Sequence, residues 1–218
     1  MSLSLNLAHE SLIARPSGAL FWPARNLLCV SDLHLGKSER MARRAGALLP
    51  PYEARETLSR LETDLEATGA STVICLGDSF DDAASLDGMD EADRLWLTRL
   101  IAGRDWVWIA GNHDAGPLNI AGSHRAEVQL GGLVFRHIAE AGAQGEVSGH
   151  FHPKARLAGK AWRCFLADRA RLILPAYGTY TGGLWTHDPA LTGLMQPGAL
   201  AILCGGTAAR AIPMPRAA

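Results

Sequence analysis

The sequence has few cysteines, and no two of them have the C-x-x-C spacing of a redox motif or a zinc site. Each of the four lies in or beside an apolar run, where a free cysteine usually behaves as a small buried hydrophobic side chain. A disulfide-stapled secreted domain and a thiolate metal site are therefore not expected. The four are Cys29, Cys75, Cys164 and Cys204.

The sequence also lacks the segments that direct a chain to a membrane or out of the cell. The N-terminus shows no basic segment followed by an apolar one, and no apolar run is long enough to cross a bilayer. We expect a cytoplasmic protein with no membrane partner.

An excess of positive charge is absent as well. Lys and Arg number 21 and Asp and Glu number 22, so the formal net charge is -1. The chain therefore lacks the global basic field that drives tight nonspecific binding to nucleic acid. A local basic patch or bound metal ions could still hold phosphate groups.

Hydrophobic residues make up 48% of the 218 residues, which is enough for a sizeable core and predicts one domain over residues 1–218. After short strands within residues 3–22, apolar strands at 27–30, 72–76 and 106–110 alternate with helices at 51–67 and 89–102. This alternation is typical of parallel βαβ units. The second half is rich in strands, which we expect at 126–130, 133–136, 146–148, 161–166, 171–174, 199–203 and 207–212.

Polar motifs follow several of these strands directly. They are Asp32-x-His34, Gly77-Asp78, Gly111-Asn112-His113-Asp114, His137 and Gly149-His150-x-His152. Ligands of open α/β sheets bind beyond the carboxyl ends of the strands, so these motifs are expected to meet at one edge. A glycine beside a ligand lets the backbone turn sharply.

The donors are oxygen and nitrogen atoms without thiolate, which suits Mn, Fe or Zn and excludes an all-oxygen calcium site. They are too many for one tetrahedral ion, so two divalent ions fit better. Two metals about 3.5–4 Å apart are a known apparatus for displacement at phosphate esters. We favour His137 as a ligand over His124, because His137 ends an apolar strand whereas His124 lies in a polar loop.

The ordered motif set from Asp32 to His152 resembles the calcineurin-like metallophosphoesterase superfamily. More narrowly, the segments at 31–37, 148–154 and 180–184 are similar to bacterial ligase-associated DNA damage response endonucleases. The resemblance implies an α/β (α+β) fold, a four-layer αββα sandwich of two mixed sheets flanked by helices.

The resemblance also implies roles for individual residues. Two divalent ions, most strongly Mn²⁺ with Fe or Zn as alternatives, would activate a bridging hydroxide as the nucleophile. His113 would protonate the leaving oxygen or stabilise the phosphoryl charge, and Asp114 could orient His113. The first ion would be held by Asp32, His34 and His152, the second by Asn112, His137 and His150, and Asp78 would bridge them.

Substrate-binding residues are less well defined by the sequence. A basic segment follows the first motif and consists of Lys37, Arg40, Arg43 and Arg44. It is either the solvent-exposed face of a helix or a phosphate-binding site at the border of the active site. Asp81 and Asp82 are either supports for the ligands or a surface loop. Tyr180, in the glycine-rich turn 177–183, could stack on a base, although a plain tight connection is the alternative.

The function that this pattern predicts is a metal-dependent phosphodiesterase. The resemblance to the endonuclease subfamily alone implies that it acts on DNA as a repair endonuclease. By family resemblance its partners would include DNA-repair proteins such as a DNA ligase or helicase. One alternative is a phosphoesterase for a small nucleotide or phosphomonoester. Another is a metal-bound, non-catalytic repair scaffold, against which the complete ligand set and His113 argue. The sequence leaves the oligomeric state open.

Overall fold

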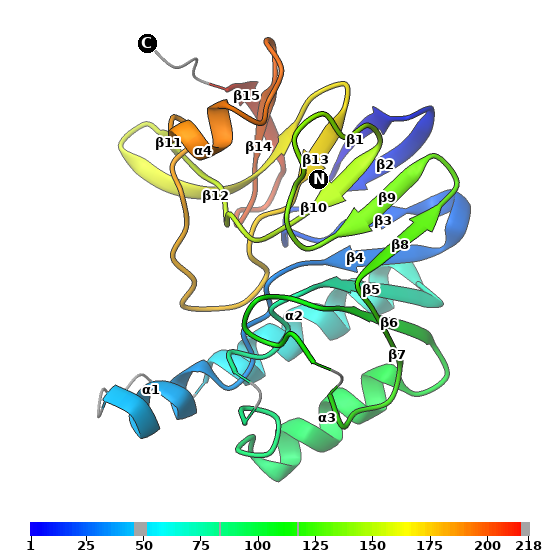
Figure 1. Cartoon of the computed structure of the whole chain (residues 1–218), viewed down its shortest axis with the longest axis vertical. Helices are drawn as coiled ribbons and strands as arrows, with labels where there is room; N and C mark the ends of the chain where they lie inside the picture. The colour runs from blue at the N-terminus through cyan, green and yellow to red at the C-terminus, as the bar shows by residue number, and fades with distance from the viewer. Residues whose placement is uncertain (46–51, 83, 117, 215–218) are drawn as a thin grey trace.

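The computed structural model describes residues 1–45, 52–82, 84–116 and 118–214, which form two β-sheets stacked face to face with helices outside them (Figure 1). The first sheet has seven strands in the order β1-β2-β3-β4-β5-β6-β7. Strands β1 to β4 are antiparallel neighbours, and β4 to β7 are parallel. The strands are β1 (Leu3–Leu7), β2 (Glu10–Ala14), β3 (Leu20–Trp22), β4 (Leu27–Val30), β5 (Thr72–Leu76), β6 (Asp105–Ile109) and β7 (Ser123–Arg125), with a 3₁₀ turn η1 (Pro23–Arg25) before β4.

The second sheet has the order β15-β14-β12-β13-β10-β9-β8, and β11 pairs with β12 outside this path. Strand β10 is parallel to both of its neighbours, β9 and β13, and the other pairs are antiparallel. The strands are β8 (Glu127–Leu130), β9 (Leu133–Arg136), β10 (Glu146–Ser148), β11 (Lys154–Leu157), β12 (Lys160–Ala167), β13 (Arg171–Ile173), β14 (Leu200–Leu203) and β15 (Arg210–Pro213).

Helices lie on the outer faces of the two sheets. The first sheet is covered by α2 (Glu53–Thr68) and α3 (Glu91–Ile101), and α1 (Lys37–Ala45) extends beside them (Figure 1). The outer face of the second sheet carries α4 (Pro189–Thr192), a single turn. The expected sandwich of two mixed sheets flanked by helices is confirmed, with a thin helical layer over the second sheet.

Three separate hydrophobic cores fill the spaces between the four layers. Side chains of a strand alternate between its two faces, and β5 shows the consequence. Val73 and Cys75 pack against the helices, whereas Ile74 and Leu76 pack between the sheets. The third core lies under α4, where Leu191 meets residues of β12 to β14.

The helix ends follow from local chemistry. The Asp90 carboxylate accepts a hydrogen bond from Ala92 N at 3.0 Å and so caps α3. Gly69 ends α2 with φ 62°, a conformation that glycine adopts without a steric penalty. The helices expected at 51–67 and 89–102 each begin two residues later in the structure. The first ends one residue later than expected, and the second ends one residue earlier.

Three short elements differ from the sequence-based expectations. The polar segment around His124 is the edge strand β7 and not a loop, since Ser123 to Arg125 pair with β6. Strand β11 and helix α4 were not expected from the sequence. Trp106 and Trp108 lie in the core under the helices, as expected for residues that share a sheet face.

All four cysteines are buried and free, in agreement with their apolar surroundings. Among the described residues, no helix is long and apolar enough to span a membrane.

We expect Ile74→Ala to lower the free energy of unfolding by about 2–5 kcal/mol, because it leaves a cavity between the sheets. The Ile74 side chain is 1% exposed. Urea denaturation in EDTA measures the change. Leu95→Ala, at a position 61% exposed on α3, is the matched control and should cost less than about 0.5 kcal/mol. Equal losses in the two variants would contradict the burial of Ile74 between the sheets.

Candidate metal centre

The carboxyl ends of the parallel strands bring the expected ligands together. Strands β4, β5 and β6 run in parallel, as do β9 and β10 in the other sheet, so that each set delivers its polar motifs to one edge. Three groups of possible metal ligands result, each with its donor atoms within 4.8 Å of one another. One group is His34, Asp81 and His113. The other two contain only expected ligands. They are Asp32, His34 and His152, and Asp78, His137 and His150.

In the first cluster, His34 and His152 turn the same ring nitrogen toward each other. Their Nε2 atoms are 3.4 Å apart, and His152 Nε2 lies 3.1 Å from Asp32 Oδ1. The other nitrogen of His34, Nδ1, lies 2.9 Å from Asp81 Oδ1. Because a carboxylate can only accept, Nδ1 carries the proton and Nε2 presents a lone pair.

The second cluster is centred on His137. Its Nδ1 donates to the carbonyl oxygen of Leu76 at 2.7 Å, so Nε2 is again the free nitrogen. This atom lies 3.0 Å from Asn112 Oδ1, 3.2 Å from His150 Nδ1 and 3.4 Å from Asp78 Oδ2. His124 belongs to neither cluster, so the structure places His137, not its rival, beside the other expected ligands.

These donors fit divalent cations. Lone pairs of imidazole nitrogens that face each other have no partner unless a cation or a proton lies between them. Asp32 Oδ1 is buried and receives no well-oriented hydrogen bond, although His152 Nε2 is near. A buried carboxylate oxygen without a donor is costly, and a metal ion would satisfy it. The mixed oxygen and nitrogen set suits Mn, Fe or Zn.

The charge states favour cation binding. Burial would raise the pKa of Asp78, but hydrogen bonds from His137 and from the His113 N–H bring it well below its usual range. Burial opposes ionisation of Asp32 too, yet contacts with His152 and Ser31 lower its pKa. Both carboxylates are therefore charged at neutral pH.

The two rings of the second cluster have opposite pKa shifts. Burial and the neighbouring His137 lower the pKa of His150, which keeps its ring neutral. For His137, burial alone would lower the pKa, but Asp78 and Asp32 raise it.

Several ligands have a backbone conformation that residues other than glycine rarely adopt. A positive φ costs such a residue roughly 1–3 kcal/mol. Hydrogen bonds between the strand-end loops hold the backbone there, for example His34 N to Asp78 O at 2.9 Å. The φ angles are 53° at Asp32, 46° at His34, 47° at Asp78, 70° at His150 and 47° at His152. Strain concentrated on these five residues marks this edge as functional.

The glycines beside the ligands are required mainly by space. A Cβ atom on Gly149 would lie 1.7 Å from Ser31 Oγ, and one on Gly111 would lie 2.2 Å from Asp78 N. No side chain fits at such distances. These two glycines allow the loops of different strands to approach closely enough for their ligands to share a site.

Residues 25–208 match the family model of the calcineurin-like phosphoesterases. The chain belongs to the calcineurin-like phosphoesterase family. A solved structure described as the Pseudomonas putida nuclease MPE is similar, with a TM-score of 0.74 and 25% sequence identity. The similarity covers 98% of this chain and 100% of that one. A comparison with curated protein sequences gives no significant match.

Family membership makes this chain a hydrolase of phosphoester bonds, and His113 lies where it can contribute. Its backbone N–H donates to Asp78 Oδ1 at 2.8 Å, and its Nδ1 donates to the Asp81 carbonyl oxygen at 2.7 Å. Its ring meets that of His34 edge-on, with centroids 5.0 Å apart. His113 thus borders the first cluster without joining either of the expected ligand sets, although its donor atoms lie near those of His34 and Asp81.

The structure corrects the expected role of Asp114. This buried carboxylate does not hydrogen-bond the His113 ring. It accepts instead from the backbone N–H groups of Asp78, Ser79, Phe80 and Gly111, at 2.8–3.2 Å. Burial raises the pKa of Asp114 in spite of these bonds. Asp114 therefore shapes the loop that carries Asp78.

The structure assigns Asp81 a contact that the sequence left open. Its side chain is 1% exposed and lies between His34 and Arg40, whose Nη1 is 2.7 Å from Oδ2. Burial would raise the pKa of Asp81, but hydrogen bonds from His34 and Arg40 and the charge of Lys37 lower it to about 2. Asp81 is a buried, charged support behind His34, an expected metal ligand, and not part of the surface.

The basic segment on α1 is largely neutralised by neighbouring carboxylates. Arg40 pairs with Asp81, and Arg43 pairs with Glu39 at 2.9 Å and with Asp82 at 3.0 Å. Arg44 lies on α1, but its side chain is outside the described part of the structure. The phosphate grip proposed for Arg40 would have to compete with this ion pair.

The glycine-rich turn at 177–183 packs against both halves of the first cluster. Tyr177 N donates to Ser31 O at 2.8 Å, and Gly178 N to Asp32 O at 3.0 Å. Gly183 has no room for a Cβ beside the His152 carbonyl. Tyr180 is 42% exposed on this turn, with φ 59°. The turn buttresses the ligand loops, and stacking of a base on Tyr180 stays a prediction.

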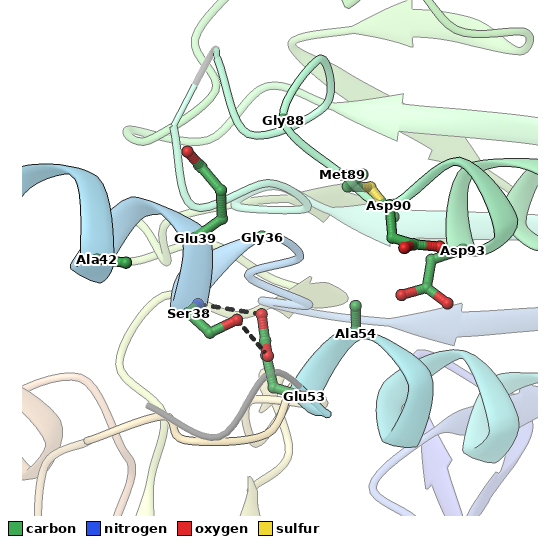
Figure 2. A pocket seen from close by; sticks show the side chains of 10 residues that line it. All are labelled: Gly36, Ser38, Glu39, Ala42, Glu53, Ala54, Gly88, Met89, Asp90 and Asp93. Carbon is green, nitrogen blue, oxygen red and sulfur yellow. Dashed lines mark hydrogen bonds between the residues drawn. The ribbon is translucent and has the colours of Figure 1, made fainter. Parts of the chain in front are cut away.

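A cavity of about 470 Å³ lies beside Gly36, between α1, α2 and the start of α3 (Figure 2). Glu53 accepts from Ser38 N at 3.0 Å and from Ser38 Oγ at 2.7 Å at its wall. The described residues that line it include four carboxylates and no Lys, Arg or His, the carboxylates being Glu39, Glu53, Asp90 and Asp93. Such a lining repels phosphates and lacks the nitrogen donors of the metal clusters.

We expect Asp81→Asn to weaken Mn²⁺ binding about 10–100-fold, because it removes the charged acceptor that orients His34. Titration calorimetry of the metal-free protein measures the affinity. Asp87→Asn, on an exposed part of the same loop, is the matched control and should bind Mn²⁺ like the wild type. Unchanged affinity in Asp81→Asn would show that His34 needs no such support.

Proposed function

We propose that this phosphoesterase is a cytoplasmic phosphodiesterase that uses two metal ions to cut DNA internally during repair. The observation that carries the proposal is the pair of ligand clusters, whose unpartnered nitrogen and oxygen donors converge at one sheet edge. The similarity of the whole chain to a solved nuclease supports a phosphodiester substrate.

Each cluster would hold one ion, and Mn²⁺ fits the donors well, with Fe or Zn as alternatives. Bound cations would neutralise phosphate charge and acidify a water molecule for in-line attack on phosphorus. The proposed ligands are Asp32, His34 and His152 for the first ion, Asn112, His137 and His150 for the second, and Asp78 between the two. Two contacts support a bridging role: Asp78 Oδ2 lies 3.4 Å from His137 Nε2, and Asp78 Oδ1 accepts from the N–H of His113, whose ring lies against that of His34.

His113 is proposed to act on the leaving group. The Asp81 carbonyl fixes its Nδ1–H, so Nε2 is the atom left to hold a proton for the departing oxygen or to stabilise charge on the phosphoryl group. The carbonyl also fixes the ring plane at the side of His34. A positioned imidazole of this kind contributes about 10²–10⁴-fold to the rate.

The substrate proposal is tested by giving the Mn²⁺-loaded enzyme three phosphate esters in parallel. They are circular single-stranded DNA, bis(p-nitrophenyl) phosphate and p-nitrophenyl phosphate. We expect linearisation of the circle, which has no ends, together with hydrolysis of the small diester. Turnover of the monoester alone would indicate a phosphomonoesterase. No turnover of any ester would favour a metal-bound scaffold, which would then be examined for DNA ligase or helicase partners.

We expect His113→Ala to keep both metals and to lower kcat on the small diester at least about a hundredfold, because it removes a proton donor and not a ligand. Asp78→Asn should instead lose metal and activity together, since it removes charge between the two clusters. Metal content by atomic emission and kcat are measured on the same samples. Loss of metal from His113→Ala would make His113 a ligand, and a fully active Asp78→Asn would exclude the two-metal assignment.

A further inference from the structure

A second basic region lies just beyond the proposed metal ligand His152, and within the described residues three of its four cations have no carboxylate partner and no carbonyl partner. Residues 147–167 contain two lysines and two arginines and no Asp or Glu. Residues 154–167 of this segment form the β11–β12 hairpin, which projects from the second sheet (Figure 1). The basic residues are Lys154, Arg156, Lys160 and Arg163.

The basic residues of the hairpin differ from those of helix α1 in whether they form ion pairs with carboxylates. Arg40 and Arg43 of α1 have carboxylate partners. Within the described residues, no carboxylate forms an ion pair with Lys154, Arg156 or Lys160, whose contacts are with tryptophan rings. A phosphate approaching the hairpin would therefore not need to displace a carboxylate.

The pairing register divides these residues between the two faces of the hairpin. Lys154 lies opposite Arg163, and Leu157 lies opposite Lys160. Directly opposed residues share a face, and alternate residues along a strand do too. Lys154, Arg156 and Arg163 thus share one face, and Lys160 lies on the other.

The face with Lys154 is the one that is continuous with the metal centre. Arg163 Nη1 donates to the carbonyl oxygens of Ala176 at 3.0 Å and Gly178 at 3.1 Å. Gly178 in turn donates its N–H to Asp32 O at 3.0 Å. Arg163 is therefore occupied in holding the turn over a metal ligand, and Lys154 and Arg156 extend the same face outward.

Trp185 holds the two free cations in place. Lys154 Nζ lies 4.7 Å and Arg156 Cζ 5.1 Å from the centroid of its ring. Backbone hydrogen bonds fix the ring beside β11, from Lys154 N to Leu184 O at 2.9 Å and from Thr186 N to Lys154 O at 3.0 Å. Cations interleaved with an aromatic ring along a strand are a common way of binding the backbone of a single-stranded nucleic acid.

We propose that the face of the β11–β12 hairpin formed by Lys154, Arg156 and Trp185 binds the phosphate backbone of the DNA strand as it leaves the metal centre. This inference rests on the proposed function. The acidic cavity beside Gly36 lies on the side of α1, α2 and α3, and it would repel the strand there. Lys154 and Arg156 are two residues apart on an extended strand, about 6.6 Å, which suits successive phosphates of an extended chain.

The test compares the double variant Lys154→Ala/Arg156→Ala with Lys160→Ala, which removes a cation from the opposite face of the same hairpin. Binding of a fluorescein-labelled single-stranded oligonucleotide is followed by anisotropy in EDTA across a salt series, so that the readout does not depend on turnover. We expect the double variant to bind about tenfold more weakly at low salt. The salt slope should fall by about 0.7 for each lost phosphate contact, or about 1.4 in all. Lys160→Ala should match the wild type.

A second readout separates substrate binding from chemistry. In Mn²⁺, kcat/KM for circular single-stranded DNA should fall about tenfold more in the double variant than kcat/KM for bis(p-nitrophenyl) phosphate. An equal fall for both substrates would overturn the proposal, because the residues would then act through the metal centre or the fold. Wild-type affinity and salt slope in the double variant, or an equal loss in Lys160→Ala, would overturn it as well.

The outcomes also distinguish this inference from the proposed function. A wild-type enzyme that hydrolyses the small diester but neither binds nor cuts DNA would refute the DNA substrate, and the inference with it. A wild-type enzyme that binds and cuts DNA, with a double variant that does the same equally well, would refute the hairpin surface alone.

Discussion

The Asp32 carboxylate joins the two sheets at the edge where the ligands meet. It follows β4 of the first sheet, and its two oxygens face residues that follow β10 of the second. Oδ2 accepts from His150 N at 3.0 Å, and Oδ1 lies 3.1 Å from His152 Nε2. These partners are 118 and 120 residues away in sequence. Because the carboxylate is buried and charged, separating the sheets at this edge would remove both of these partners, which is strongly destabilising.

The geometry of the site depends on how closely the loops that follow the strands of the two sheets approach one another. Gly149 has no room for a side chain beside Ser31, and Asp114 gathers four backbone N–H groups around the turn that carries Asp78. The same closeness imposes the positive φ angles of the ligands. Their cost is offset by buried hydrogen bonds and, on binding, by the cations. The metal ions would therefore stabilise the fold as well as supply the chemistry, since ligands that bind only the native state raise its stability.

The sequence predicts well which polar residues meet at this edge, because their positions depend on a regular feature. Apolar strands are recognised by their runs, and parallel strands deliver their ends to one edge, so Asp32, Asp78 and His137 could be placed without coordinates. Contacts between residues far apart in the sequence could not be predicted in this way, because no periodic pattern marks them. Asp81 pairs with Arg40, which lies 41 residues earlier, and no rule of sequence spacing predicts this ion pair. Asp114 binds backbone N–H groups, which every residue has, so its sequence position beside His113 suggested the wrong partner.

The arrangement of charge reconciles a net charge of -1 with the polyanionic substrate that we propose. Association with DNA depends on the local potential along the path of the phosphates and not on the sum over the chain. On α1, the arginines at 40 and 43 form ion pairs with Asp81, Asp82 and Glu39. Carboxylates also line the cavity beside Gly36. On the hairpin after His152, the carboxylates are missing and the cations rest on Trp185. A basic residue is therefore informative about phosphate binding only together with its partners. By that criterion the favourable path leads from the metal centre along β11, where the sequence alone had drawn attention to Arg40 and its neighbours.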